Sequence, residues 1–157
     1  MKLFGAIDVG ASSGRVIAGY FDGETLKLNE VHRFQNGPVT ANGRVHWDFD
    51  ALFENIKTGL SKLSDESEKT GIKITSVGID TWAVDYGLLK DGNLIAQPYC
   101  YRDEQNQLGV EQVDKALSFE SIYEIAGIQF LPFNTVYQLS KQKTMGDKSL
   151  AEAEKAM

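Results

Sequence analysis

Three strand-forming runs at the N-terminus, the first two joined by a short polar corner, constrain the fold more than any other feature of the sequence. Residues 3–9 are almost continuously apolar, which is typical of a strand buried on both faces. Residues 15–21 form a second run that ends at Asp22-Gly23, a dipeptide that favours a tight hairpin turn. A third run follows over residues 25–34. Together the three runs predict a three-stranded antiparallel meander.

The middle of the chain predicts a helix and then a further strand. Asp48 or Asp50 can cap the helix, apolar residues recur at helical spacing after them, and Gly71 can end it. Residues 35–48 are rich in Gly, Asn and Pro, so we expect a loop before this helix. Residues 74–80 are apolar enough to predict another buried strand.

The last third of the chain predicts a turn at Asp91-Gly92 and then short helices. The expected helices cover residues 107–117, residues 119–126 with Ser118 as cap and Gly127 as stop, and residues 135–143 behind Asn134. The final stretch, DKSLAEAEKAM, begins another helical pattern and carries no signal that would end it. This pattern indicates a fragment of a longer protein.

Charge and cysteine usage narrow the class of protein. The net charge of −6 and the absence of a basic patch argue against nucleic acid or an anionic membrane surface as the main partner. The N-terminal apolar run is short and is broken by Asp8, so it predicts neither a signal peptide nor a membrane span. The single cysteine, Cys100, excludes an intrachain disulfide. We therefore expect a cytoplasmic protein.

The polar corner, DVGASSGR at residues 8–15, differs from the common nucleotide-binding loops because it joins a strand to a strand. The chain contains neither G-x-x-x-x-G-K-[ST] nor G-x-G-x-x-G. Gly10 and Gly14 permit positive φ angles and a close approach of the backbone to a ligand. Arg15 offers a planar fork to phosphate oxygens, and Asp8 is suited to hold Mg²⁺ through water. A tight hairpin with polar residues at its tip is the alternative interpretation.

The sequence AIDVGASSGRV resembles the first phosphate-binding hairpin of the FGGY carbohydrate kinases, which belong to the actin-like, ribonuclease H-like ATPases. Three further stretches resemble the rhamnulokinase subfamily and occur in the same order: RVHWDFDALF, VGIDTWAVDYGLL and AGIQFLPFNTVYQL. The resemblance runs from about Phe4 to Leu139. It implies an α/β fold of the ribonuclease H-like type, with a mixed sheet that starts with the meander and is flanked by helices.

The resemblance also implies an activity and a nucleotide site. Enzymes of this subfamily transfer the γ-phosphoryl group of MgATP to the 1-hydroxyl of L-rhamnulose. By matching motif, the ATP phosphates should face Ala11, Ser12, Ser13, Gly14 and Arg15, and the metal should lie at Asp8. ATP and a ketose are thus the expected partners, with Mg²⁺ as cofactor.

The sugar is expected at the sequence DTWAVD. The family's sugar contact falls on Ala83, where relatives often have glycine. Trp82 lies between Asp80 and Asp85, and an aromatic face suits the C–H surface of a sugar while carboxylates suit its hydroxyls. A core tryptophan beside turn aspartates is the alternative. Gln105 stands where the family commonly has arginine.

Several parts of the family's active site do not match any residue of this chain. In the family, the catalytic base is an aspartate of a later segment. The second phosphate loop and the adenosine site also lie in later segments. We therefore expect residues 1–157 to form part of the N-terminal kinase domain, to need a C-terminal domain as partner, and to have negligible activity alone. Two alternatives remain open. One is L-fuculokinase or another FGGY ketose kinase, and the other is a non-catalytic actin-like module that uses the hairpin for assembly.

Overall fold

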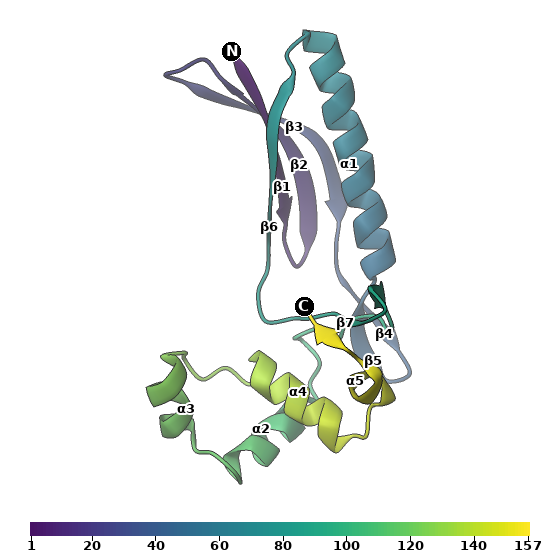
Figure 1. Ribbon diagram of the computed structural model, residues 1–157, viewed down its shortest axis with the longest axis vertical. Coiled ribbons are helices and arrows are strands. Elements are labelled where there is room, and N and C mark those ends of the chain that lie inside the picture. Colours follow the sequence, from purple (N-terminus) through teal and green to yellow (C-terminus); the bar gives the residue numbers. More distant parts are fainter. The chain divides into compact units, whose positions relative to one another are not determined.

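The computed structural model describes residues 1–157, which divide into two compact units (Figure 1). The first unit consists of residues 1–37 and 48–83, and the second of residues 38–47 and 84–157. Each unit therefore combines segments that lie far apart in the sequence. No helix is long and apolar enough to cross a membrane.

The first unit is a four-stranded mixed sheet in the order β3-β2-β1-β6 with one long helix packed on it (Figure 1). Its strands are β1 (Lys2–Val9), β2 (Ser13–Phe21), β3 (Leu26–Gln35) and β6 (Ile74–Thr81). The first three pair in antiparallel fashion, so the predicted meander is confirmed. β6 pairs with β1 in parallel, and the helix before β6 supplies the crossover that a parallel pairing needs.

The crossover helix α1 (Phe49–Thr70) begins and ends as the sequence predicts. Asp48 Oδ1 accepts a hydrogen bond from the backbone N–H of Ala51 at 2.9 Å, and Gly71 ends the helix at φ 70°. A Cβ atom at Gly59 would lie 2.3 Å from Cγ2 of Val16, so the missing side chain lets α1 approach β2 closely. The core between α1 and the sheet comprises Leu3, Ile7, Val9, Val16, Ala18, Phe34, Leu52 and Leu63.

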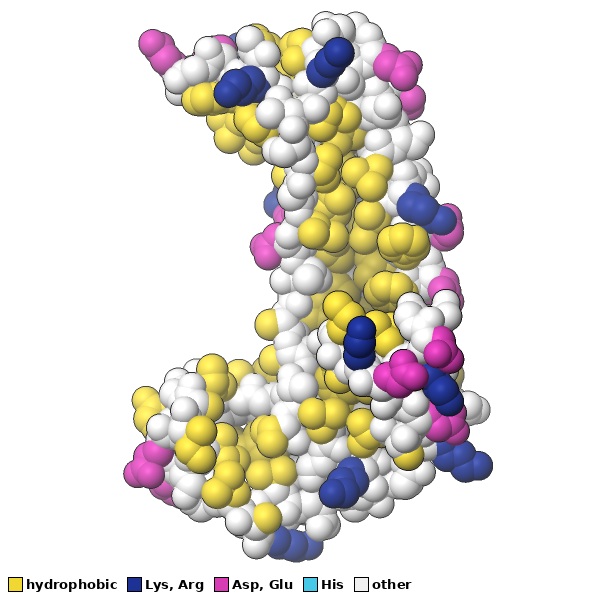
Figure 2. Space-filling view, in the orientation of Figure 1, with side chains coloured by type: hydrophobic (Ala, Val, Ile, Leu, Met, Phe, Trp, Pro, Cys, Tyr) yellow, Lys and Arg dark blue, Asp and Glu magenta, His cyan; other side chains and the backbone are white.

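β6 corrects one expectation, because it is not buried. It is an edge strand whose residues 75–81 are all exposed, with Val77 46% and Ile79 62% exposed. Val77 and Ile79 lie opposite buried residues of β1, so their side chains point to the same face of the sheet as α1. The helix covers that face over the other strands and leaves β6 uncovered. Figure 2 shows apolar side chains exposed along the first unit between β6 and α1. The apolar sequence of a strand reports its composition but not its place in the sheet.

The second unit contains two small sheets and four helices. The strands are β4 (Pro38–Ala41), β5 (Arg44–Trp47), β7 (Leu88–Lys90), β8 (Asn93–Leu94) and β9 (Lys155–Ala156). The expected loop over residues 35–48 is wrong, because residues 38–47 form the β4–β5 hairpin. Its turn residues Asn42 and Gly43 both have positive φ, as a tight hairpin requires. The predicted turn at Asp91-Gly92 is confirmed, with φ angles of 50° and 76°.

The helices of the second unit are α2 (Asn106–Asp114), α3 (Phe119–Ala126), α4 (Thr135–Thr144) and α5 (Lys148–Glu152). Ser118 caps α3 and Gly127 ends it, as predicted. The expectation of a helix running to the end of the chain is wrong. The backbone becomes extended at Ala153, and residues 155–156 pair with β7.

Candidate functional site

The corner between β1 and β2 is short and tied down by hydrogen bonds. The strands pair without interruption from Lys2 with Phe21 to Val9 with Gly14. The backbone N–H of Gly10 donates to the carbonyl of Ser13 at 3.0 Å. Asn36 braces the corner from the end of β3, because its backbone N–H donates to Ser12 O at 3.1 Å and its Nδ2 to Gly10 O at 2.8 Å. No signal in the sequence connects Asn36 with this corner.

The glycines of the corner correct a second expectation. Neither Gly10 nor Gly14 has a positive φ angle. A Cβ atom at Gly14 would lie 2.1 Å from the ring of Phe34, so packing against β3 is what excludes a side chain there. A Cβ atom at Gly10 would lie 3.0 Å from Ser13 O, inside the turn. The role of Gly14 at the ATP phosphates stays a prediction.

A row of charged side chains crosses the sheet beside the corner. In the register of the sheet, Asp8 of β1 lies opposite Arg15 of β2 and opposite Asp80 of β6. Arg15 in turn lies opposite Arg33 of β3. Directly opposed residues of neighbouring strands point to the same face of a sheet. Because Ile7 and Val9 point toward α1, the row of Asp8, Arg15, Asp80 and Arg33 lies on the opposite face.

The Asp8–Arg15 pair is accessible to ligands. Arg15 donates from Nε to Asp8 Oδ2 at 2.8 Å, and its Nη2 lies 2.8 Å from the same oxygen. The side chains of Arg15 and Asp8 are 44% and 45% exposed, and an exposed pair of this kind contributes little to stability. The pair fits MgATP, since Mg²⁺ binds few carboxylates and several waters, and a guanidinium matches phosphate oxygens. The structure contains no larger cluster of metal-ligating side chains.

The segment DTWAVD spans the boundary between the two units. Asp80, Trp82 and Ala83 belong to the first unit, whereas Asp85 belongs to the second. Trp82 is half-buried against the first core, and Asp80 and Ala83 are exposed. The ring of Trp82 thus partly serves the core, which the alternative interpretation expected, and its role toward a sugar stays a prediction.

Asp85 accepts hydrogen bonds from side chains that sequence reasoning did not connect with it. Trp47 Nε1 donates to its Oδ2 at 2.6 Å, and Gln138 Nε2 donates to its Oδ1 at 3.1 Å. Trp47 and Gln138 are 2% and 1% exposed. Both carboxylate oxygens of Asp85 therefore bind protein donors, and its predicted contact with a sugar is untested.

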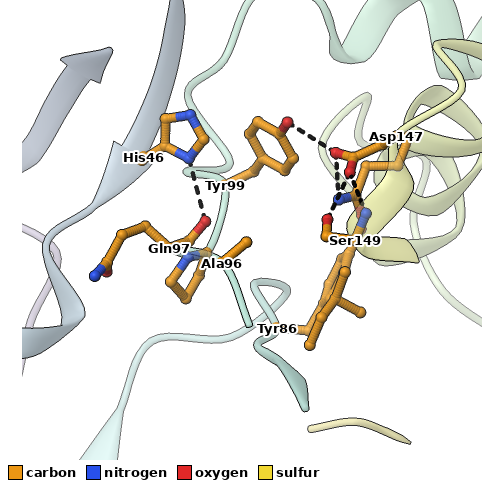
Figure 3. A pocket seen from close by; sticks show the side chains of 10 residues that line it. His46, Tyr86, Ala96, Gln97, Tyr99, Asp147 and Ser149 are labelled. Carbon is orange, nitrogen blue, oxygen red and sulfur yellow. Dashed lines mark hydrogen bonds between the residues drawn. The ribbon is translucent and has the colours of Figure 1, made fainter. Parts of the chain in front are cut away.

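A pocket of about 190 Å³ in the second unit has Asp147 in its wall (Figure 3). Tyr99 and Gln142 donate to Asp147 Oδ2 at 2.8 and 3.0 Å, and the N–H of Ser149 donates to Oδ1 at 2.9 Å. Although burial opposes it, the hydrogen bond that the Ser149 hydroxyl donates to Oδ1, together with these bonds, holds the pKa of Asp147 below its usual value. Burial and Asp147 raise the pKa of Tyr86, which donates to Gln142. The polar groups thus bind one another, which indicates a structural role.

A larger pocket of about 510 Å³ is lined mainly by apolar side chains of α3 and of the segment that enters α4. Val84 and Thr135 also line it. Val84, which lines this pocket, directly follows Ala83 in the sequence. Most binding sites for small molecules combine such apolar walls with a few polar groups.

Residues 3–157 match the N-terminal domain of the FGGY family of carbohydrate kinases. The chain belongs to this family. The rhamnulokinase of Ligilactobacillus salivarius (strain UCC118) is 43% identical over 143 residues, which are 90% of this chain and 29% of that protein. The rhamnulokinase of Lactiplantibacillus plantarum (strain ATCC BAA-793 / NCIMB 8826 / WCFS1) is 46% identical, over 90% of this chain and 28% of that protein. The FGGY chain thus spans less than a third of these relatives.

Solved structures of carbohydrate kinases have the same fold. A xylulose kinase from Rhodospirillum rubrum superposes with a TM-score of 0.83 at 12% identity, over 99% of this chain and 32% of that one. A ligand-bound xylulose kinase from Lactobacillus acidophilus gives 0.77 at 19% identity, over 99% and 31%. At such identities the likeness shows the fold alone. It confirms the predicted α/β fold of the FGGY kinases.

Proposed function

We propose that this chain is part of an ATP-dependent sugar kinase that phosphorylates the 1-hydroxyl of L-rhamnulose. The observation that carries the proposal is the 43–46% identity to two rhamnulokinases over 90% of the chain. The structure supports it with an exposed carboxylate and guanidinium beside the β1–β2 corner. The alternative of an assembly module does not account for the DTWAVD and GIQFLPFNT stretches.

In this proposal the corner binds the nucleotide. The ATP phosphates lie against residues 11–15, and Arg15 exchanges its contact with Asp8 for phosphate oxygens. The released Asp8 carboxylate would hold Mg²⁺ through water, and the metal would supply positive charge that offsets the charge of the phosphoryl group. Asn36 keeps the corner in place, so positioning costs little rearrangement.

The sugar contacts are proposed on the segment that follows β6. Ala83 is exposed and presents its backbone, Trp82 offers part of a ring face, and Asp80 offers a carboxylate at the carboxyl end of β6. The contact of Asp85 with a sugar stays a separate prediction, because Asp85 belongs to the second unit, where its Oδ2 accepts a hydrogen bond from Trp47.

We further propose that residues 1–157 are one part of the N-terminal kinase domain. The catalytic base, the second phosphate loop and the C-terminal domain would then come from the remainder of the complete protein. The exposed apolar side chains of Val77 and Ile79 support this, because monomeric soluble proteins rarely leave such edges uncovered. The 157 residues alone should therefore have negligible kinase activity.

Substrate preference tests the proposed function. We expect the complete protein to release ADP with L-rhamnulose at a kcat/KM roughly 100-fold above that with L-fuculose, L-xylulose or glycerol, because a site built for one set of hydroxyls rejects another. The measurement is a coupled ADP assay, with residues 1–157 as the inactive control. Preference for L-fuculose would keep the mechanism and change the substrate. No turnover with any of the four would favour the assembly module.

Replacing Asp8 tests the nucleotide corner. We expect Asp8→Asn in the complete protein to lower kcat by about 100-fold or more, because the carboxylate that holds the metal is lost. The fold should persist, since an exposed ion pair contributes only about 0–1 kcal/mol. Glu30→Gln is the matched control, because Glu30 forms a similar exposed pair with Arg33 on β3. Turnover by Asp8→Asn equal to that of Glu30→Gln would remove Asp8 from the mechanism.

A further inference from the structure

Two successive residues of β3, Val31 and His32, face the same side of the sheet. Val31 packs against the first core, and a Cβ atom at Gly59 of α1 would lie 3.3 Å from Cδ2 of His32. The register between β2 and β3 shifts at this point, which is the mark of a β-bulge. A bulge re-aims the side chains beside it. As a result Glu30 and Arg33, although three positions apart, both lie on the outer face of the sheet, opposite α1.

Arg33 is held on this face by Glu30 and is open to ligands. Its Nε donates to Glu30 Oε1 at 2.9 Å, and its Nη2 donates to Oε2. The guanidinium thus engages both oxygens of one carboxylate, and the same fork geometry suits phosphate. The side chain of Arg33 is 51% exposed. The hydrogen bond from Arg33 lowers the pKa of Glu30, and the charge of Arg15 on the next strand adds to this effect.

The order of charges on the outer face places like beside like. Across the sheet the row reads Asp80, Asp8, Arg15 and Arg33, so two carboxylates are neighbours at one end and two guanidiniums at the other. Like charges directly opposite each other on adjacent strands are unfavourable. An anion that lies over Arg15 and Arg33 together would remove the repulsion between them. A chain of phosphates offers such an anion, with several oxygens for each guanidinium.

We propose that Arg33 is a second phosphate-binding residue of the nucleotide site, whose guanidinium joins that of Arg15 against the phosphate oxygens of ATP. This inference rests on the proposed function, in which the β1–β2 corner binds ATP. β3 ends at the same corner, because Gln35 lies opposite Ser13 and Asn36 donates to Gly10 O. Arg33 exchanges Glu30 for phosphate oxygens.

Direct binding of MgATP to the complete protein tests this inference without turnover. We expect Arg33→Gln to raise the Kd for MgATP about tenfold, which is a usual loss for a hydrogen-bonded charge. The KM for L-rhamnulose should change less than about twofold. The Tm should stay nearly the same, because an exposed ion pair contributes little to stability. Isothermal titration gives the Kd, and a coupled assay gives the KM.

Two control variants separate a phosphate contact from other effects of the substitution. Glu30→Gln breaks the same ion pair but leaves the guanidinium, so its Kd for MgATP should stay within about twofold of that of the unmodified protein or be lower. Lys27→Gln removes one positive charge at the other end of β3, where Lys27 is exposed and lies opposite Tyr20. Its Kd should also stay within about twofold, because salt screens a charge at that distance.

The outcomes separate this inference from the proposed function. An unchanged Kd in Arg33→Gln would overturn the inference. Equal rises in Arg33→Gln and Glu30→Gln would also overturn it, because the ion pair would then act through the structure of β3. A protein that binds MgATP through Arg33 but phosphorylates no sugar would support the inference and overturn the L-rhamnulose assignment. A complete protein that binds no MgATP would overturn both.

Discussion

Replacing Gly109 with alanine is expected to lower the free energy of unfolding of the second unit by about 3 kcal/mol or more. A Cβ atom at this position would lie 1.8 Å from Tyr137 O, 2.7 Å from Tyr137 C and 3.1 Å from Lys141 N. These are backbone atoms of α4, so no side-chain rotation relieves the overlap. Helices α2 and α4 would have to move apart, and the buried side chains between them would lose contacts.

The sign of this prediction is informative because alanine usually favours a helix. At an open helical position, a change from glycine to alanine stabilises by up to about 1 kcal/mol. The expected loss in free energy of unfolding at Gly109 therefore comes from the overlap between α2 and α4 and not from helix propensity. Since α4 also carries Thr135 and Gln138, a shift of this helix would loosen Val84 as well.

Urea unfolding of residues 1–157 with fluorescence detection measures this effect. A Trp82→Phe background leaves Trp47 as the only tryptophan, and Trp47 is 2% exposed in the second unit. Gly78→Ala is the matched control, because nothing lies within 4 Å of a Cβ atom there and its φ is not positive. It should change stability by less than about 0.5 kcal/mol. Equal midpoints for the two variants would show that α2 and α4 do not meet at Gly109.

The elements that the sequence predicted correctly depend on local signals. Helix α1 begins after Asp48 and ends at Gly71, and α3 begins after Ser118 and ends at Gly127. The dipeptide Asp91-Gly92 forms a hairpin turn. Each signal acts through hydrogen bonds or φ angles within a few residues. The missed β4–β5 hairpin had such a signal in Asn42-Gly43. The prediction of a loop gave more weight to the surrounding Gly, Asn and Pro residues.

The candidate site was predictable only where one turn brings residues together. Asp8 and Arg15 lie on adjacent strands of one hairpin, so the sequence indicated that they belong to one site. The contact of Gly14 with Phe34 depends on pairing with a third strand. Asp85 meets Trp47 and Gln138 across 38 and 53 positions. No periodicity within a single sequence reports contacts of that range.

Replacing Asp103 with asparagine is expected to lower the free energy of unfolding by about 3–5 kcal/mol. Arg44 Nε donates to Asp103 Oδ2 at 2.8 Å, and Lys141 Nζ lies 3.9 Å from the same oxygen. The side chains are 12%, 3% and 0% exposed for Arg44, Asp103 and Lys141. Asparagine keeps the shape but removes the charge, so two buried cations would lose their carboxylate. Glu54→Gln is the control, since Glu54 pairs with Lys57 at the exposed surface and should cost less than about 0.5 kcal/mol.

The pH dependence of this loss distinguishes the electrostatic cause from a packing defect. Burial lowers the pKa of Lys141 to about 8, and the charge of Asp103 opposes that shift. An unfolded lysine has a pKa of about 10.4, so above pH 8 the unfolded chain holds more protons than the folded one. The contribution of Lys141 to stability therefore rises with pH between about 8 and 10.4.

Without the carboxylate at position 103, the pKa of Lys141 should fall further, and Lys141 should become neutral at lower pH. The destabilisation by Asp103→Asn should therefore be larger at pH 7 than at pH 9.5. Burial raises the pKa of Cys100, and the charge of Asp103 adds to that rise, so the proteins are compared in a Cys100→Ala background that removes this thiol. In a Lys141→Met background, the loss caused by Asp103→Asn should not change between the two pH values. A loss independent of pH in the Lys141 protein would assign the effect to packing rather than to the buried charges.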